Sequence, residues 1–189
     1  MGQYSATANQ SVANIVSGAG TPATNIFRMP RRNFNGNGVG IPWAASGGTG
    51  TITDNNGVGW DGSNEASTLN MTSPGGTNPW QIGYSDNSNL PAGTYTIAVN
   101  VKSNSGSNEV FRFNESVGFS PTQTATTSWT RVKHTFTAAS PFSITNESLM
   151  ADFVTNPYAD SKNANLIAMD LDLYPGSTDL EPVAPDSHF

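Results

Sequence analysis

Residues 90–102 read LPAGTYTIAVNVK. A Pro-Ala-Gly turn is followed by strict alternation, in which Tyr95, Ile97, Val99 and Val101 fall on one face of an extended chain. Thr, Ala, Asn and Lys side chains occupy the other face. The stretch therefore predicts a strand over 94–102 that packs one side against a core.

Short apolar runs separated by turn residues continue on both sides of this strand. The turn clusters are Ser-Gly-Gly at 46–48, Asn-Asn-Gly at 55–57 and Ser-Pro-Gly-Gly at 73–76. The spacing is typical of a β-sandwich. Further strands are predicted at 41–45, 49–53, 66–72, 79–84, 110–113, 128–138, 142–145, 148–154 and 166–174.

Two of these strands have informative patterns. In 128–138, Val132 and Phe136 share one parity with His134, whereas Trp129 has the other, which predicts a bulge or bend near residue 130. In 166–174 the alternation predicts that four apolar side chains face inward and that Asp170 and Asp172 face outward. The inward set is Ile167, Met169, Leu171 and Leu173.

Composition supports a single all-β domain in this chain of 189 residues. Nine Phe, five Tyr and four Trp are too many for a disordered chain, while the abundance of Gly, Asn, Ser and Thr disfavours helices. A net charge of −6 and a pI of about 4.6 argue against nucleic acid and membrane surfaces as partners. The absence of cysteine excludes disulfides and thiol catalysis. No secretory signal is expected at residues 1–6.

The two ends differ from the middle. Residues 1–40 are predicted to form an extended arm, and 179–189 a proline-containing tail or strap. The arm holds three of the eight basic residues within five positions, flanked by aromatic rings; the group is Phe27, Arg28, Arg31, Arg32 and Phe34. One interpretation is a solvated linker, and the other is a docking segment whose arginines pair with carboxylates on a partner.

Catalysis finds little support in the sequence. No pair of acidic residues has a known catalytic spacing, and no Gly-x-Ser-x-Gly elbow accompanies His134 or His188. His134 is therefore interpreted as a packed or hydrogen-bonded structural residue. We expect no enzyme activity and no cofactor.

Residues 54–65 are rich in oxygen ligands of the kind that calcium prefers. They miss the EF-hand pattern, because Val58 occupies a ligand position. Asn-Gly and Asp-Gly pairs are also common hairpin turns, so the segment is interpreted as turns and no metal site is predicted, with a structural calcium as the alternative.

Exposed aromatic rings near loops could stack on sugars, since the C–H faces of a pyranose pack well on an indole or phenol ring. The candidates for glycan binding are Trp60, Trp80, Tyr84 and Tyr158. Trp43 and Trp129 are expected in the core.

The chain resembles the jelly-roll, carbohydrate-binding-module-like domains of bacteriophage virion proteins, found in head-decoration and tail-fibre proteins. The resemblance is carried by 90–97 (LPAGTYTI), by 128–132 (SWTRV) with Phe136, and by 171–177 (LDLYPGS). It covers 90–178 well and 41–84 loosely. Tyr174-Pro175 stands where acidic residues usually precede the family's glycine. The resemblance implies a two-sheet antiparallel jelly-roll sandwich over 41–178.

The resemblance also implies a function. The chain would be a non-catalytic protein made in the host cytoplasm and placed on the outer surface of a virion. It would be a capsid decoration or cement protein that binds and stabilises the major capsid shell through its arm and assembles as a homotrimer. The alternatives are a receptor- or glycan-binding module of a tail fibre or tail tip, recognising a host-surface glycan, and a glycan-active enzyme of sandwich fold.

Overall fold

A computed structural model describes residues 50–71, 81–84, 89–115, 117–143, 147–151 and 163–177, with the backbone alone at 54–55, 81–84 and 147–151. All regular structure in this part is β-strand, which confirms the predicted fold class. The strands are β1 (Gly50–Gly57), β2 (Ala66–Met71), β3 (Gln81–Tyr84), β4 (Asn89–Leu90), β5 (Gly93–Ser103), β6 (Glu109–Glu115), β7 (Gly118–Phe119), β8 (Gln123–Ala125), β9 (Thr130–Ala138), β10 (Phe142–Ser143), β11 (Glu147–Ala151) and β12 (Ala164–Pro175).

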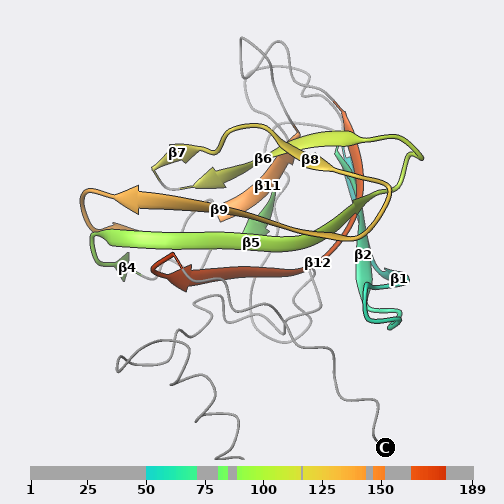
Figure 1. The fold of residues 1–189 in the computed structure, drawn as a ribbon, viewed down its shortest axis with the longest axis horizontal. Coiled ribbons are helices and arrows are strands. Elements are labelled where there is room, and N and C mark those ends of the chain that lie inside the picture. The colour runs from blue at the N-terminus through green and yellow to red at the C-terminus, as the bar shows by residue number, and fades with distance from the viewer. Residues whose placement is uncertain are drawn as a thin grey trace, which may run out of the picture.

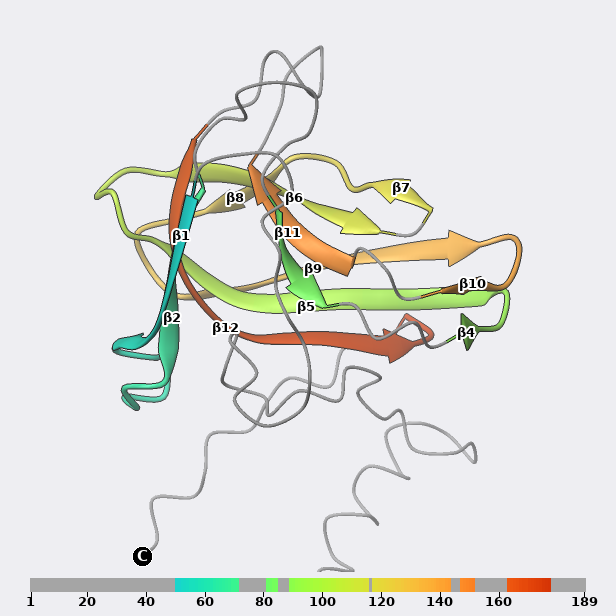
Figure 2. The ribbon, with the colours of Figure 1, turned by 180° about the vertical axis from the view of Figure 1, so that it is seen from behind.

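The strands form two antiparallel five-stranded sheets and a short β4–β10 ladder (Figures 1 and 2). The first sheet has the order β1-β2-β12-β5-β9, and the second has the order β3-β11-β6-β7 with β8 also paired to β6. If β2, β3, β5, β6, β8, β9, β11 and β12 are counted as strands one to eight, the sheets contain 1-8-3-6 and 2-7-4-5. That order is a jelly roll, so the fold predicted by resemblance is confirmed by the connectivity itself.

The core lies between the two sheets. Tyr95, Ile97, Val99 and Val101 are all buried in one apolar cluster, as the alternation in residues 94–102 predicted. β6 contributes two buried rings from the second sheet, Phe111 and Phe113, which meet edge to face with ring centroids 5.6 Å apart. At 25 cal/mol per Å² of apolar surface, burying each such side chain contributes about 1.5–3 kcal/mol to folding.

The predicted facing of β12 is wrong in its first half. The core-facing residues there are Ala164, Leu166 and Ala168, whereas Ile167 and Met169 lie on the other side. The pairing of β12 with β5 shifts register between Met169 and Asp172, and Asp170 has a φ of 55°. This bulge inserts one residue and exchanges the two faces, so that Leu171 and Leu173 then point into the core.

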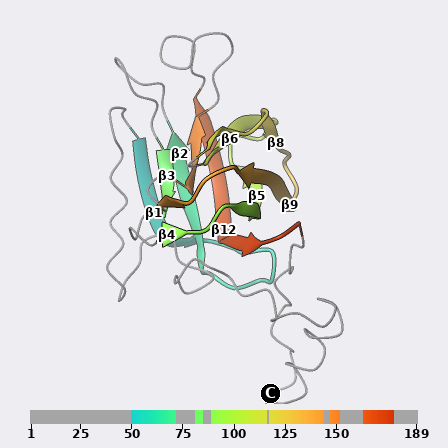
Figure 3. The ribbon, with the colours of Figure 1, turned by 90° about the vertical axis from the view of Figure 1, so that its left-hand side faces the viewer.

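The bulge coincides with a change in direction of the strand. Residues 164–168 of β12 pair with β2, whereas the pairing of β12 with β5 continues to Pro175. Figures 1 and 2 show β12 bending between these two parts. Seen from the side in Figure 3, β1 and β2 stand upright while β9 and the end of β12 cross the view. Bulged strands bend and increase the local twist, which accounts for this shape.

The bend predicted near residue 130 is also wrong. β9 pairs with β5 in unbroken register from Thr130, opposite Val101, to Ala138, opposite Gly93. Trp129 differs in parity from Val132 because its side chain faces outward, where it is half-buried. The prediction that Trp129 lies in the core is therefore wrong. The Nζ atom of Lys102 lies 5.4 Å from the centroid of its ring.

The turn predicted at 55–57 belongs to a strand. β1 continues to Gly57, with a register shift against β2 between Thr53 and Gly57, and the connection follows at 58–65. The other predicted strands from residue 66 onward match β2, β3, β5, β6, β9, β10, β11 and β12 in type and approximate position.

Several predictions lie outside the described residues. These are the strand at 41–45, the whole of the 1–40 arm and of the 179–189 tail, and the residues Trp43, Trp80 and Tyr158. The five docking candidates, Phe27, Arg28, Arg31, Arg32 and Phe34, also lie there. A search of the described residues for a helix long and apolar enough to cross a membrane finds none.

Candidate functional site

The outer face of the first sheet carries an aromatic loop. Residues 58–65 connect β1 to β2 and close on themselves, since Gly59 N–H donates to Ser63 O at 2.7 Å and Gly62 N–H donates to Gly59 O at 3.1 Å. A Cβ atom added at Gly59 would lie 2.7 Å from Sδ of Met169 on β12, so the loop backbone packs directly on the sheet. This packing places Trp60 above the bulge of β12.

A buried carboxylate fixes the indole of Trp60. Its Nε1–H donates to Oδ2 of Asp170 at 2.7 Å, and Nδ2 of Asn100 on β5 donates to the same oxygen at 2.8 Å. Asp170 is 2% exposed although it was predicted to face solvent. Because charged groups are rarely buried without partners, these two donors explain how the carboxylate is accommodated.

Arg131 of β9 completes the cluster on the far side of β5. Its Nη1 donates to the main-chain oxygen of Asp170 at 2.8 Å, and its Nη2 pairs with Oδ2 of Asp172 at 2.7 Å. Asp172 lies on the outer face of the sheet, as the alternation predicted, but it is fully buried there by Arg131. One guanidinium therefore ties β9 to the bulge of β12 across the intervening strand. We call Trp60, Asn100, Arg131, Asp170 and Asp172 the outer-face cluster.

The 58–65 loop has the features of a turn. Ser63 N–H donates to Oδ1 of Asp61 at 3.0 Å, and Gly62 has a φ of 82°, a conformation that favours glycine. Within the described ranges, no group of three or more His, Asp or Glu side chains could hold a metal ion. The Asp61–Ser63 hydrogen bond and the φ of Gly62 agree with the turn interpretation of this loop.

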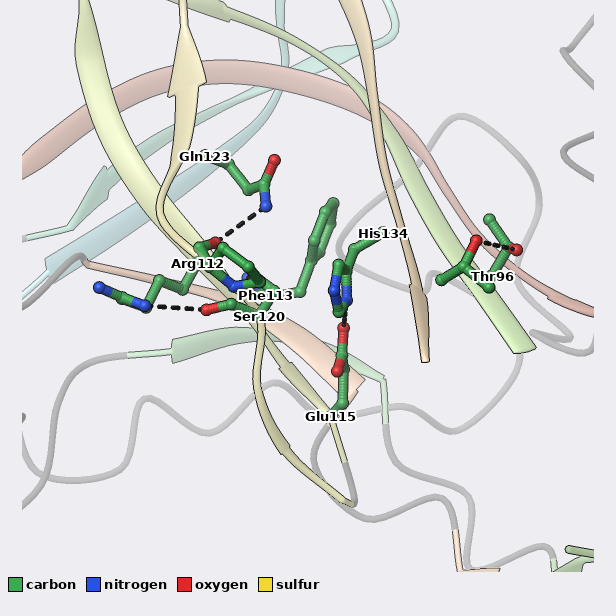
Figure 4. A network of polar contacts seen from close by, with 9 residues as sticks. Thr96, Arg112, Phe113, Glu115, Ser120, Gln123 and His134 are labelled. Carbon is green, nitrogen blue, oxygen red and sulfur yellow. Dashed lines mark hydrogen bonds and ion pairs between the residues drawn. The ribbon is translucent and has the colours of Figure 1, made fainter. Parts of the chain in front are cut away.

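A second polar contact links the two sheets. Nδ1 of His134 on β9 lies 2.6 Å from Oε1 of Glu115 on β6, and the carboxylate side chain is 2% exposed (Figure 4). Nearby, Ser120 follows β7 and contacts two residues of β6: its Oγ accepts from Phe113 N–H at 3.0 Å, and Arg112 Nη1 donates to its main-chain oxygen at 2.9 Å. His134 is therefore the hydrogen-bonded residue that the sequence predicted.

Of the four aromatic residues predicted to bind glycans, only Trp60 has a described side chain. Trp60 is half-buried on the outer-face cluster, and Tyr84 ends β3, where only the backbone is described. Sequence reasoning missed Asn100 and Arg131 as members of a site and assigned Asp170 and Asp172 to solvent. Two aspartates alternating within an otherwise apolar strand were the available signal, because such residues are either exposed or tightly paired.

Comparisons with solved structures return carbohydrate-binding modules. The ligand-free CBM1 of BiXyn10A is 11% identical with a TM-score of 0.45, covering 73% of this chain and 93% of that one. The N-terminal cellulose-binding domain of Cellulomonas fimi β-1,4-glucanase C is 13% identical with a TM-score of 0.40, covering 72% and 90%. TmCBM61 in complex with β-1,4-galactotriose is 13% identical with a TM-score of 0.41, covering 81% and 99%. No protein-family model and no curated protein sequence matches this chain.

Proposed function

We propose that this chain is a non-catalytic binding protein whose sandwich recognises a saccharide on the outer face of the first sheet. The observation that carries the proposal is the Trp60–Asp170 hydrogen bond of 2.7 Å, which holds a half-buried indole in one orientation on a rigid sheet. A ring fixed before binding loses little conformational entropy when a ligand stacks on it.

The chemistry of the loop suits a sugar. With its N–H engaged by Asp170, Trp60 offers its apolar surface, which is the part of an indole that packs on pyranose C–H groups. Asn64 is exposed in the same loop, so its side-chain amide is available for hydroxyls. An aromatic surface with a few polar neighbours is the usual composition of a saccharide site.

The burial and hydrogen bonding of Asp170 and Asp172 disfavour glycoside hydrolysis. It requires one carboxyl that carries a proton and a second that acts as a base or nucleophile, both reaching the sugar. Asp170 and Asp172 are buried beneath Trp60 and Arg131 and their oxygens accept hydrogen bonds from protein donors. These contacts favour a structural role for the pair and binding without turnover.

A glycan array with the purified full chain tests the proposal. We expect wild-type binding to a defined set of glycans and at least a tenfold loss for Trp60→Ala, equivalent to about 1.4 kcal/mol. Phe119→Ala is the matched control, because Phe119 is an exposed aromatic residue of the second sheet, 45% accessible. Equal binding by Trp60→Ala and wild type would contradict the assignment of this face.

A second proposal concerns where the protein works. We propose that it decorates a virus particle as a homotrimer on the major capsid protein, with residues 1–40 as the docking segment. Its support is the uneven charge of the sequence: Arg28, Arg31 and Arg32 lie together in a chain of net charge −6. Removing residues 1–32 should leave a folded sandwich that no longer co-sediments with empty heads, and retained co-sedimentation would contradict the docking role.

A further inference from the structure

We infer that the outer face of the first sheet binds an acidic, carboxylate-bearing saccharide, with Trp129 as a second stacking ring and Lys102 and Lys133 as its charge partners. The inference rests on the proposed saccharide binding and specifies the ligand class. It also assigns a binding role to a tryptophan that the sequence placed in the core.

The register of β5 and β9 brings the two tryptophans to the same face. Asn100 lies opposite Arg131, so Lys102 and Trp129 face each other one step outward along the ladder. Asn100 shares the carboxylate of Asp170 with Trp60. Since a strand rises about 3.3 Å per residue, Trp60 and Trp129 are tied to β5 positions roughly 7 Å apart.

The outer-face row beside Trp129 is covered by β1 at its far end, because Thr68 Oγ1 donates to Asn56 Oδ1 at 2.8 Å and a Cβ atom at Gly57 would lie 2.9 Å from Cγ2 of Ile167. Lys102, Ile167 and Thr68 occupy one row across β5, β12 and β2, according to the strand register, and all three are half-buried. Trp129 is half-buried as well. A ligand that stacks on Trp129 would therefore lie over β5 and β9 and meet the Lys102 ammonium group beside the ring.

The charge of this face argues for an anionic ligand. Asp170 and Asp172 are paired with Arg131 and the other donors of the outer-face cluster, which leaves Lys102 and the exposed Lys133 as the remaining charges of the β5–β9 strip. Among the described residues, no carboxylate forms an ion pair with either lysine. A locally positive strip beside an aromatic ring, in a chain of net charge −6, fits a sugar carboxylate.

The same charges are too few for nucleic acid as the intended ligand. Binding a phosphate backbone uses many simultaneous cation contacts and is opposed by the overall negative charge. Two lysines can instead pair with carboxylates on successive units of one ligand, since Lys102 lies beside Trp129 and Lys133 lies about 13 Å further along β9, and an oligomer of uronic acids presents such a row of carboxylates.

The test is titration calorimetry of the full chain with oligogalacturonate and with the same oligomer after reduction of its carboxylates. We expect oligogalacturonate to bind at least tenfold more tightly than the reduced oligomer and to weaken as salt rises. Lys102→Met and Lys133→Met should each reduce this preference several-fold. Trp129→Ala should weaken both oligomers about tenfold, Trp129→Phe should restore part of the loss, and Phe119→Ala should change neither.

The outcomes separate the inference from the proposed function. Binding of the reduced oligomer as tight as that of oligogalacturonate, or acidic binding unaffected by Trp129→Ala and Lys102→Met, would overturn the inference and leave saccharide binding at Trp60 standing. A glycan array without any ligand would overturn both. Equal affinity for a single-stranded oligonucleotide would show that the strip selects charge alone and would also overturn the inference. Unchanged melting temperatures of the variants exclude unfolding as the cause of a loss.

Discussion

His134 and Glu115 join the two sheets of the sandwich through a contact of 2.6 Å between Nδ1 and Oε1. β9 and β6 belong to different sheets, so this contact spans the interior near its rim rather than following a ladder. The carboxylate is almost completely buried, whereas the imidazole side chain is 25% exposed. Glu115 therefore depends on its protein partners for solvation more than His134 does.

Removing the imidazole should destabilise the protein. His134→Ala leaves the buried Glu115 carboxylate without its histidine partner, and we expect a loss of about 3 kcal/mol in the free energy of unfolding. The double variant His134→Leu with Glu115→Leu should recover most of that loss, because it also removes the charge. Urea denaturation of both variants and of each single leucine variant measures the coupling. Simple additivity of the single changes would show that the two side chains do not act as a pair.

Tyr95 should make stability fall at alkaline pH. Burial raises the pKa of its phenol above 10.0, because the charged phenolate is poorly solvated in the core. The neutral form is thus favoured in the fold, so its contribution to stability is complete below about pH 10, the unfolded value. It is lost as the pH rises through the raised folded pKa. Denaturant midpoints measured from pH 8 to 11 should decline in wild type.

Tyr95→Phe separates that effect from ordinary alkaline damage. The variant should lose the part of the pH dependence above 10 that Tyr95 causes. At neutral pH it should be about 1 kcal/mol less stable, because the Tyr95 hydroxyl donates to Pro91 O at 2.7 Å. An identical alkaline decline in Tyr95→Phe and wild type would assign the titration to other groups.

Two glycines of the 58–65 loop should respond differently to alanine. Gly59→Ala places a Cβ atom 2.7 Å from Sδ of Met169, which is fully buried, and 2.8 Å from Oδ1 of Asp61. We expect a loss of roughly 2 kcal/mol from overpacking and a displaced Trp60. Gly62→Ala meets no atom within 4 Å but keeps a φ of 82°, so about 1 kcal/mol is expected from backbone strain alone.

Thermal melts and tryptophan emission distinguish these two mechanisms. Gly59→Ala should lower the melting temperature and shift the emission maximum, since it moves the loop that carries Trp60. Gly62→Ala should lower the melting temperature without that shift. Emission changes of equal size in both variants would contradict direct packing of Gly59 on the sheet.

The sequence predicts those parts of the fold in which period-two alternation is unbroken. Residues 94–102 have no inserted residue, and each apolar position found its place in the core. In β12 the bulge at Asp170 reverses which side chains face the core. The hydropathy pattern cannot reveal this bulge, because it does not report the positive φ of Asp170. The errors at Ile167, Met169 and Asp170 follow from that one residue, whereas Asp172 keeps its predicted outer face and is buried there by its contact with Arg131.

The candidate site was harder to predict because its members are distant in sequence. Trp60 and Asp170 are 110 positions apart and meet only when the 58–65 loop folds over β12. Trp129 was misassigned for a related reason, since an aromatic residue next to a buried strand is usually core. Here its ring is placed beside Lys102 by the register of β5 and β9.

Asp170 should be the most sensitive residue of the outer-face cluster. Asp170→Ala removes the acceptor of both Trp60 and Asn100 and puts alanine at a φ of 55°, so we expect a loss of about 3 kcal/mol in the free energy of unfolding. Asp170→Asn keeps a residue that tolerates this φ and retains one amide oxygen for the indole, and should lose roughly half as much. Asp170→Gly relieves the backbone strain but lacks the acceptor, which isolates the contribution of the hydrogen bonds.

The readout specific to the hydrogen bond is the indole N–H of Trp60 in a proton–nitrogen correlation spectrum. A charge-assisted bond of 2.7 Å should give a downfield and slowly exchanging signal in wild type. The signal should move upfield and exchange faster in Asp170→Ala and Asp170→Gly alike, with an intermediate position in Asp170→Asn. An unchanged Trp60 signal in the alanine and glycine variants would mean that the loop, rather than the carboxylate, orients the ring. Trp60 would then owe its position to the packing of Gly59 on Met169.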